Sequence, residues 1–211
     1  DNKGNAKTSF GGGRLGTTHK MSERILTDSI EYWTKEFKVD GFRFDMMGDH
    51  NADSITHAYE KAKTHNPNTL FLGEGWTTYA GDDNDKGIQA ADQQWMKNTS
   101  VVGVFSDEIR NELKSGYGSE GQARFITGGA RSIDTIFNNI KAQPGNFVAD
   151  EPKDVVNYIE AHDNLSLYDV IAQSIKKDPL LHNKEILQRQ RLGNFMILTS
   201  QGMSFLHAGQ E

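Results

Sequence analysis

The sequence of 211 residues contains no cysteine, no long apolar run and no excess of basic residues. The absence of cysteine excludes disulfide bonds and thiolate metal sites but leaves the cellular compartment open. No apolar run approaches the ~20 residues that a membrane-spanning helix requires. With 23 basic against 29 acidic residues and a net charge of -6, the composition argues against a nucleic-acid-binding surface, which needs a basic patch.

The N-terminus also lacks a secretory signal, because the chain begins Asp1-Asn2-Lys3-Gly4 without a methionine or an apolar segment. We interpret this start as that of a fragment or processed piece of a longer polypeptide. Hydrophobic residues make up 36% of the chain, which suits one domain with a sizeable core, since domains usually hold roughly 100–200 residues. We therefore treat residues 1–211 as part of a single domain.

The first half of the chain alternates helical and strand patterns after a polar, Gly-rich loop. Ser22 is a suitable N-cap for a helix that ends near Lys38. Strands at 40–46 and 70–73 flank a second helix at 54–63, and this alternation indicates parallel strands joined by crossover helices. The first helix is expected to bury one apolar face, formed by Leu26, Ile30, Trp33 and Phe37.

The second half continues the alternation. Its patterns predict strands at 101–105, 155–159 and 203–207. They also predict one helix capped by Ser106 and three further helices at 131–140, 166–176 and 183–199. Strands that alternate with helices in this way indicate an α/β architecture.

The first strand, at 40–46, has apolar side chains on one face and two charged side chains on the other. Its alternation places Phe42, Phe44 and Met46 on one face and Arg43 and Asp45 on the other. A cation beside a carboxylate favours the ionised form that a nucleophile or an electrostatic stabiliser needs. A structural ion pair at a strand end would give the same pattern.

Three acidic residues lie just after, or at the ends of, three separate strands: Asp45, Glu74 and Asp163. In an α/β barrel the carboxyl ends of the strands carry the active site. The strands before Asp45 and Glu74 should be neighbours ~4.8 Å apart, and a retaining glycosidase needs its two carboxyl groups ~5–5.5 Å apart. His162 and Asn164, which flank the third acid, can hydrogen-bond sugar hydroxyls.

Three motifs resemble those of the α-amylase superfamily of glycoside hydrolases. In the family's order they are Asp40-Gly41-Phe42-Arg43-Phe44-Asp45, Gly73-Glu74-Gly75-Trp76 and His162-Asp163-Asn164. Other stretches are similar to type I pullulanases and related debranching enzymes, namely residues 10–16, 46–48, 158–161 and 205–211. The superfamily's first motif, an aspartate and a histidine on an earlier strand, is absent, as is the debranching group's upstream Tyr-Asn-Trp-Gly signature.

This resemblance implies part of a (β/α)8 TIM barrel, from about the fourth strand to the eighth. A complete barrel needs ~250 residues, and an open piece would expose strand edges that normally pair. We therefore expect the piece to be poorly stable and inactive alone. Its partners would be the rest of its own barrel and accessory domains.

The resemblance also implies a role for each motif residue. Asp45 would be the nucleophile, Arg43 its positioning cation and Glu74 the general acid/base. Asp163 would bind sugar hydroxyls and stabilise the transition state, with His162 contacting the sugar beside it.

Three further residues are candidates for substrate binding. Asn164 can hydrogen-bond sugar hydroxyls, and Trp76 could stack on a sugar face or be a core aromatic. His50 is either a substrate contact or a solvent-facing loop residue. We expect a raised pKa for Glu74, because the strand before Glu74 is apolar and the charge of Asp45 is near.

The function expected from these features is hydrolysis of α-1,6 branch linkages in pullulan, amylopectin, glycogen or limit dextrins, through a covalent glycosyl-enzyme intermediate. An α-1,4-acting amylase or a branching enzyme is the nearer alternative, because linkage choice depends on loops. A non-catalytic glucan-binding relative would be expected to lack one of the three acids. A metal-dependent hydrolase would need clustered histidines, and the seven here are scattered.

No cofactor is expected. The resemblance allows a structural calcium ion, but the calcium-like run Asp82–Gly87 lacks two of the required ligands and reads better as a solvated turn. Gly11, Gly13 and Gly16 match a dinucleotide-binding pattern without the preceding strand that it requires. These glycines are better explained by a close approach of the backbone to another group.

A surface or secreted bacterial enzyme is suggested by the resemblance alone.

Overall fold

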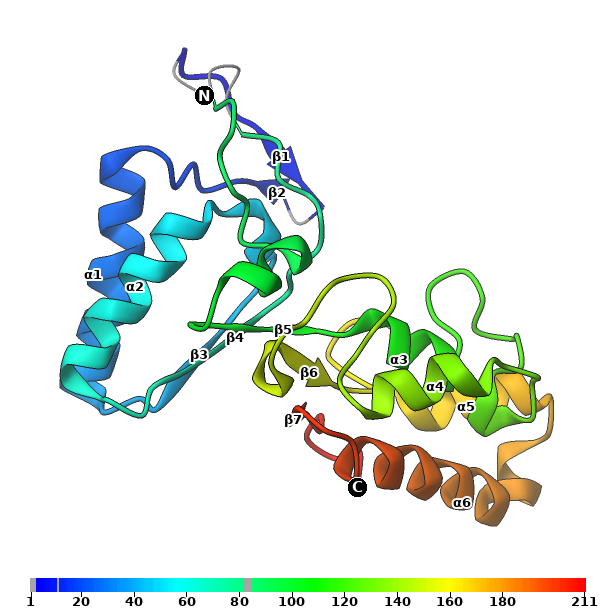
Figure 1. Ribbon diagram of the computed structural model, residues 1–211. Helices are drawn as coiled ribbons and strands as arrows, with labels where there is room; N and C mark the ends of the chain where they lie inside the picture. The colour runs from blue at the N-terminus through cyan, green and yellow to red at the C-terminus, as the bar shows by residue number, and fades with distance from the viewer. Residues whose placement is uncertain (1–2, 11, 82–84) are drawn as a thin grey trace. The chain divides into compact units, whose positions relative to one another are not determined.

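The computed structural model describes residues 3–10, 12–81 and 85–211. It divides into two compact units, residues 1–104 and 105–211, which are described in turn (Figure 1). Among the described residues, no helix has both the length and the apolar character needed to cross a membrane.

Among its described residues, the first unit contains two helices, a small hairpin near the N-terminus and three parallel strands, the last of which ends at the first residue of the second unit. The helices are α1 (Lys20–Phe37) and α2 (Ala52–His65), which lie side by side. The parallel strands are β3 (Gly41–Phe44), β4 (Leu70–Gly73) and β5 (Gly103–Phe105), in this spatial order. The hairpin pairs β1 (Thr8–Ser9) with β2 (Gly12–Gly13), and single 3-10 turns are η1 (Met47–Asp49) and η2 (Gln93–Asn98).

The core of the first unit forms around Phe71 of β4, which is buried. The rings of Phe42, Phe44 and Tyr59 surround it, with centroid separations of 5.6, 5.1 and 5.3 Å. The expected inward positions of Phe42 and Phe44 are thus confirmed. Met46 departs from the alternation, because the strand ends at Phe44 and Met46 has a left-handed φ of 44°.

Two expectations for the first helix are wrong. The helix begins at Lys20 with His19 as its N-cap, so Ser22 lies inside it. Its buried side chains are those of Thr27, Ile30 and Thr34, whereas the side chains of Trp33 and Phe37 are exposed and contact each other with their rings tilted by 42°.

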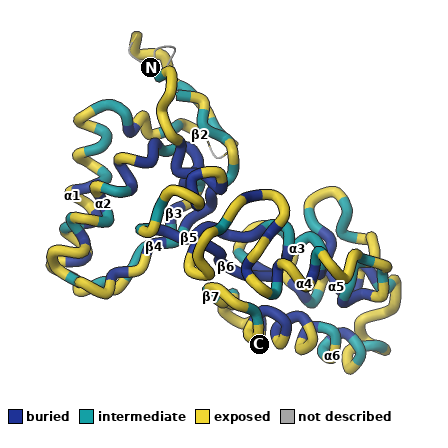
Figure 2. The backbone as a smooth tube through the Cα atoms, viewed as in Figure 1, coloured by how far each residue is buried: buried dark blue, intermediate teal, exposed yellow. Residues whose placement is uncertain are grey.

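Threonine can be buried at these positions because its hydroxyl bonds to the preceding turn. Thr34 Oγ1 donates to the carbonyl of Ile30 over 2.8 Å. Figure 2 shows the residues of β5 in dark blue as buried, whereas buried and exposed residues alternate along α1 and α2.

The second unit contains four helices and two short parallel strands among its described residues. The helices are α3 (Asp107–Leu113), α4 (Ile133–Ile140), α5 (Leu167–Ile175) and α6 (Pro179–Leu198). The strands are β6 (Val155–Asn157) and β7 (Met203–Ser204), and the 3-10 turns are η3 (Phe125–Thr127) and η4 (Pro152–Asp154). Its fully buried side chains include Ile109, Leu113, Ile159, Leu167, Ile171, Ile186 and Ile197.

The predicted α/β class is confirmed, and the helix and strand centres agree with the sequence patterns. Several ends differ by a few residues because caps decide them. The Asp178 side chain accepts the N–H of Leu180, so α6 begins at Pro179, but His182 has non-helical angles (φ -119°, ψ 17°) and the helix beyond this kink begins near 183, as predicted. Ser106 stands at the N-cap of α3 as expected, but its side chain makes no capping hydrogen bond.

Candidate functional site

The register between β3 and β4 brings two of the three candidate acids together. Phe44 pairs with Gly73 at the carboxyl ends of the two parallel strands, so Asp45 and Glu74 both come next in the chain. The N–H of Glu74 donates to the Phe44 carbonyl over 3.0 Å. The N–H of Met46 donates to Glu74 Oε2 over 2.9 Å, which ties the loop after one acid to the side chain of the other.

Arg43 contacts both acids. Its Nη1 forms a hydrogen-bonded ion pair with Asp45 Oδ1, and its Nη2 lies 3.1 Å from Glu74 Oε1. The guanidinium therefore offsets the repulsion between two adjacent carboxylates. The sequence predicted the pair with Asp45 but not the one with Glu74, because a contact between strands requires their register.

The two carboxylates differ in exposure. The side chain of Asp45 is 70% exposed, whereas that of Glu74 is only 8% exposed. An accessible carboxylate can approach a substrate atom directly. A buried carboxyl held by a backbone N–H has a defined orientation, which proton transfer requires.

A tight crossing of two loops holds this arrangement. The N–H of Gly48 donates to the carbonyl of Glu74 over 2.9 Å. A Cβ atom at Gly48 would lie 1.8 Å from the carbonyl oxygen of Trp76, so only glycine fits there. The loops that follow β3 and β4 are thereby fixed to each other.

Trp76 and His50 lie in these two loops. Trp76 is half-buried. His50 is also half-buried, and burial lowers the pKa of its imidazole, with Asp49 opposing the shift. Its Nδ1 is buried without a hydrogen-bond partner among the described residues, which argues against the solvent-facing interpretation.

The third acid lies in the second unit. Asp163 follows β6 in a loop where the side chains of His162 and Asp163 are 59% and 52% exposed. His162 Nε2 lies 3.6 Å from Asp163 Oδ1, beyond hydrogen-bond distance. Asn164 has a left-handed φ of 70°, and its Oδ1 accepts the N–H of Leu165 over 2.7 Å, so its side chain also shapes the turn toward α5.

A buried polar group supports this loop and was not predicted from the sequence. Glu160 is buried, and its Oε2 accepts the N–H of Leu167, the first residue of α5. Its Oε1 lies 2.7 Å from Nδ1 of His207. Glu160 therefore anchors the segment that leads into His162 and Asp163. Both Glu160 and His207 belong to stretches that carry the family resemblance, but their contact joins residues distant in sequence.

The same unit buries a lysine. Lys114 is 2% exposed, and burial lowers its pKa to about 8. The neighbouring cation Arg110 acts in the same direction, whereas Glu160 and Glu120 oppose the shift. No sequence pattern distinguished this lysine from exposed ones.

No metal site is formed by the side chains in the parts of the chain that the structure describes, since no three His, Asp or Glu residues are grouped to hold an ion. Of the calcium-like run, residues 82–84 lie outside the described residues, as does Gly11 of the dinucleotide-like pattern. Among the described residues, no atom beyond the adjoining residues lies within 4 Å of a Cβ built at Gly13, so the expected close approach to another group stays a prediction there.

Comparison with known proteins gives several relatives, although no family model matches. Pullulanase A of Streptococcus pneumoniae is 62% identical over 213 residues, which is 100% of this chain and 17% of that protein. The group B Streptococcus pullulanase SAP, solved with maltotetraose, is 64% identical with a TM-score of 0.94, covering 99% of this chain and 27% of its own. The type I pullulanase of Bacillus subtilis, solved with maltose, is 28% identical with a TM-score of 0.87, covering 100% of this chain and 29% of its own. The chain thus spans less than a third of each relative.

Proposed function

This chain belongs over its whole length with the type I pullulanases and related glycogen-debranching enzymes, and on that premise we propose that the protein containing it is a retaining glycoside hydrolase. Its substrates are α-1,6 branch linkages in pullulan, amylopectin, glycogen or limit dextrins. The chain contributes about strands four to eight of a (β/α)8 barrel, and its partner in the reaction is an α-glucan or an oligosaccharide derived from one. No cofactor takes part in the proposed reaction.

The observation that carries this proposal is the adjacency of Asp45 and Glu74 with Arg43 between them. In the first step, a carboxylate oxygen of Asp45 attacks the anomeric carbon while the bond to the leaving oxygen breaks. Glu74 donates its proton to that oxygen, and a glycosyl ester on Asp45 remains. In the second step, Glu74 takes a proton from water, the water oxygen attacks the anomeric carbon, and the ester bond breaks.

In this proposal the other candidate residues bind the substrate sugars. Asp163 and His162 hydrogen-bond hydroxyls of the ring that reacts, and Asn164 both shapes their loop and contributes its amide. Trp76 stacks on a neighbouring sugar face. His50, in the loop after Asp45, is a weaker contact that acts as a neutral imidazole, since burial lowers its pKa.

The test uses the full-length protein with pullulan and with unbranched amylose as substrates. We expect maltotriose from pullulan, little product from amylose, and loss of activity in Asp45→Asn. The matched control is Asp53→Asn, which makes the same change at an exposed position of α2. Cleavage of amylose in place of pullulan would indicate an α-1,4-acting enzyme, and cleavage of neither would favour a glucan-binding relative.

A further inference from the structure

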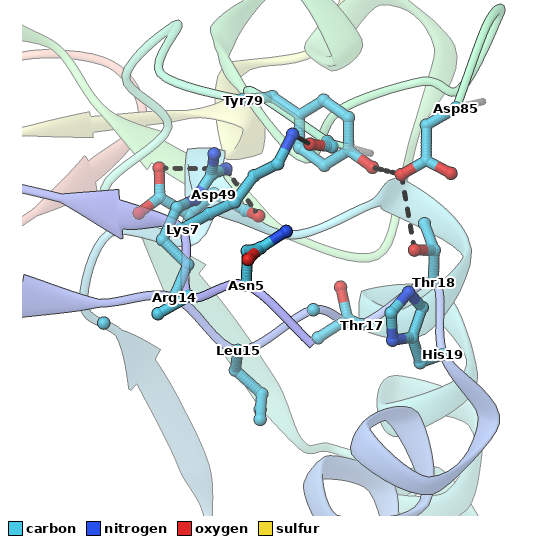
Figure 3. Close-up of a pocket in the computed structure, with 14 residues that line it drawn as sticks. Asn5, Lys7, Arg14, Leu15, Thr17, Thr18, His19, Asp49, Tyr79 and Asp85 are labelled. Atoms are coloured by element: carbon cyan, nitrogen blue, oxygen red, sulfur yellow. Dashed lines mark hydrogen bonds and ion pairs between the residues drawn. The ribbon is translucent and has the colours of Figure 1, made fainter. Parts of the chain in front are cut away.

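The first unit contains a cavity of about 180 Å³ that none of the proposed catalytic residues line. Its walls come from the segment around β1 and β2, from the residues just before α1, from Asp49, and from the loop after β4. Figure 3 shows Tyr79, Asp85 and Thr18 joined by hydrogen bonds on one side, with Leu15 across from them.

The walls of this cavity are attached to the two loops that carry Asp45 and Glu74. Arg14 Nη2 donates to the Asp49 carbonyl over 3.1 Å and lies 3.4 Å from Asp49 Oδ1. Thr78 Oγ1 donates to the same carboxylate over 2.7 Å, which connects the loop after β4 to the loop after β3. The cavity is therefore at the end of the strands where the two acids lie.

The charges in the walls are balanced within the walls themselves. Arg14 and Asp49 form a buried ion pair, and Lys7 donates to the carbonyl of Gly81. Asp85 Oδ2 accepts from the hydroxyl of Tyr79 over 3.1 Å and from that of Thr18 over 3.4 Å. A cavity without a surplus of one charge favours a neutral ligand over a phosphate or a metal ion.

The size and surface of the cavity match one sugar ring. Its volume of about 180 Å³ lies below the roughly 300–1,000 Å³ of ordinary ligand pockets, so it suits a ligand no larger than a single sugar ring. Leu15 and the Tyr79 ring supply apolar surface, although the Arg14 guanidinium lies over that ring at 5.6 Å from its centroid. Hydroxyl, amide and carboxylate groups lie around the cavity, as in pockets that orient polar ligands. Gly13 leaves its part of the wall open, since nothing lies within 4 Å of a Cβ there.

We propose that this cavity binds one glucosyl unit of the α-glucan, as a subsite separate from the pair of acids. The proposal rests on the proposed function, because the glucan that is cleaved is the ligand. Tyr79 and Asp85 provide the contacts with the sugar, and the hydrogen bond from Thr78 to Asp49 keeps their loop attached to the loop after Asp45. Filling this subsite increases the affinity for the glucan without contributing to bond cleavage.

The kinetic test compares Tyr79→Ala and Asp85→Ala in the full-length protein with pullulan as substrate. Loss of one ring or carboxylate contact is expected to raise KM about three- to tenfold, with kcat within about twofold of the unmodified value. Tyr79→Phe, which keeps the ring, should raise KM less than Tyr79→Ala. Tyr32→Ala, at an exposed tyrosine of α1, is the control outside the cavity. An unchanged KM in both Tyr79→Ala and Asp85→Ala would overturn the proposal.

A binding test separates this proposal from the proposed function. Maltotetraose is titrated into the Glu74→Gln protein with and without Tyr79→Ala, and a crystal structure of the complex locates the sugar. Weaker binding together with a glucosyl unit in the cavity supports the subsite even if pullulan is not hydrolysed. Equal affinities, or sugar only elsewhere, contradict it while leaving the hydrolase intact. Should Tyr79→Ala fail to fold, Thr18→Val takes its place, because it removes one hydroxyl from the same wall.

Discussion

Arg43 Nη2 lies 3.1 Å from Glu74 Oε1, a contact between a residue of β3 and the residue that follows its neighbour β4. The other terminal nitrogen of Arg43 pairs with Asp45, so one planar cation orients both carboxylates. A guanidinium presents its donors in a rigid fork, whereas an ammonium is a compact point charge. The geometry of the acid pair therefore depends on arginine at this position.

We predict that Arg43→Lys lowers kcat on pullulan by about 100-fold, the scale expected when a reacting group is displaced by about 1 Å. The charge is retained, but a single ammonium cannot hold both carboxylates in the same way. Steady-state kinetics with purified full-length protein measure this loss. Arg24→Lys, at an exposed ion pair on α1, is the control and should stay within about twofold. Near-normal turnover in Arg43→Lys would mean that charge alone is sufficient.

Gly48→Ala should disturb the crossing of the two loops that carry the acids. The added Cβ would lie 1.8 Å from the Trp76 carbonyl oxygen, and forced backbone shifts of this kind typically cost about 1–3 kcal/mol. We expect a lower melting temperature and reduced turnover together. Gly121→Ala is the matched control, because nothing lies within 4 Å of a Cβ at that residue. Equal melting temperatures for the two variants would contradict the predicted clash.

Phe71→Ala should strongly destabilise the first unit. Phe71 is buried among three other aromatic rings, and removing such a side chain typically costs about 3–5 kcal/mol. Thermal unfolding of the full-length protein measures the effect. Phe10→Ala makes the same change at a side chain that is 88% exposed, so it should leave the melting temperature nearly unchanged. A small effect at Phe71 would show that this core repacks.

Lys114 should make stability depend on pH in the alkaline range. Burial lowers its pKa to about 8 from 10.5, so between these values the unfolded state binds more protons than the folded state. The free energy of unfolding contributed by Lys114 therefore rises with pH across this window. We expect Lys114→Met to be more stable than the unmodified protein at pH 7, by a margin that shrinks toward pH 10.

Melting temperatures of Lys114→Met and the unmodified protein at several pH values between 7 and 10 measure this margin. Because other titrating groups are shared, their effects cancel in the difference. Lys97→Met, at an exposed lysine, should show a difference that does not vary with pH. A constant margin for Lys114→Met would mean that the lysine stays protonated in the folded state throughout.

The first helix shows where sequence patterns lose their predictive power. Apolar spacing indicated Trp33 and Phe37 as inward residues, yet Thr34 is buried and both aromatics are exposed. Hydropathy treats threonine as polar, but its hydroxyl bonds to the Ile30 carbonyl within the helix. A local hydropathy pattern does not show that a buried hydroxyl has a hydrogen-bond partner. It also does not show which face of a helix packs against a neighbouring element.

The sequence by itself determined the order of helices and strands, the acids that follow the strands, and the pair formed by Arg43 and Asp45 on one strand face. These features depend on spacing along a single element, which the period of a strand or helix sets. Only the tertiary structure decided the contact of Arg43 with Glu74, the burial of His50 Nδ1 and of Lys114, and the cavity beside Tyr79. Each of these depends on strand register or on the packing of segments distant in the chain, and both are set by burial across the whole unit rather than by neighbouring residues.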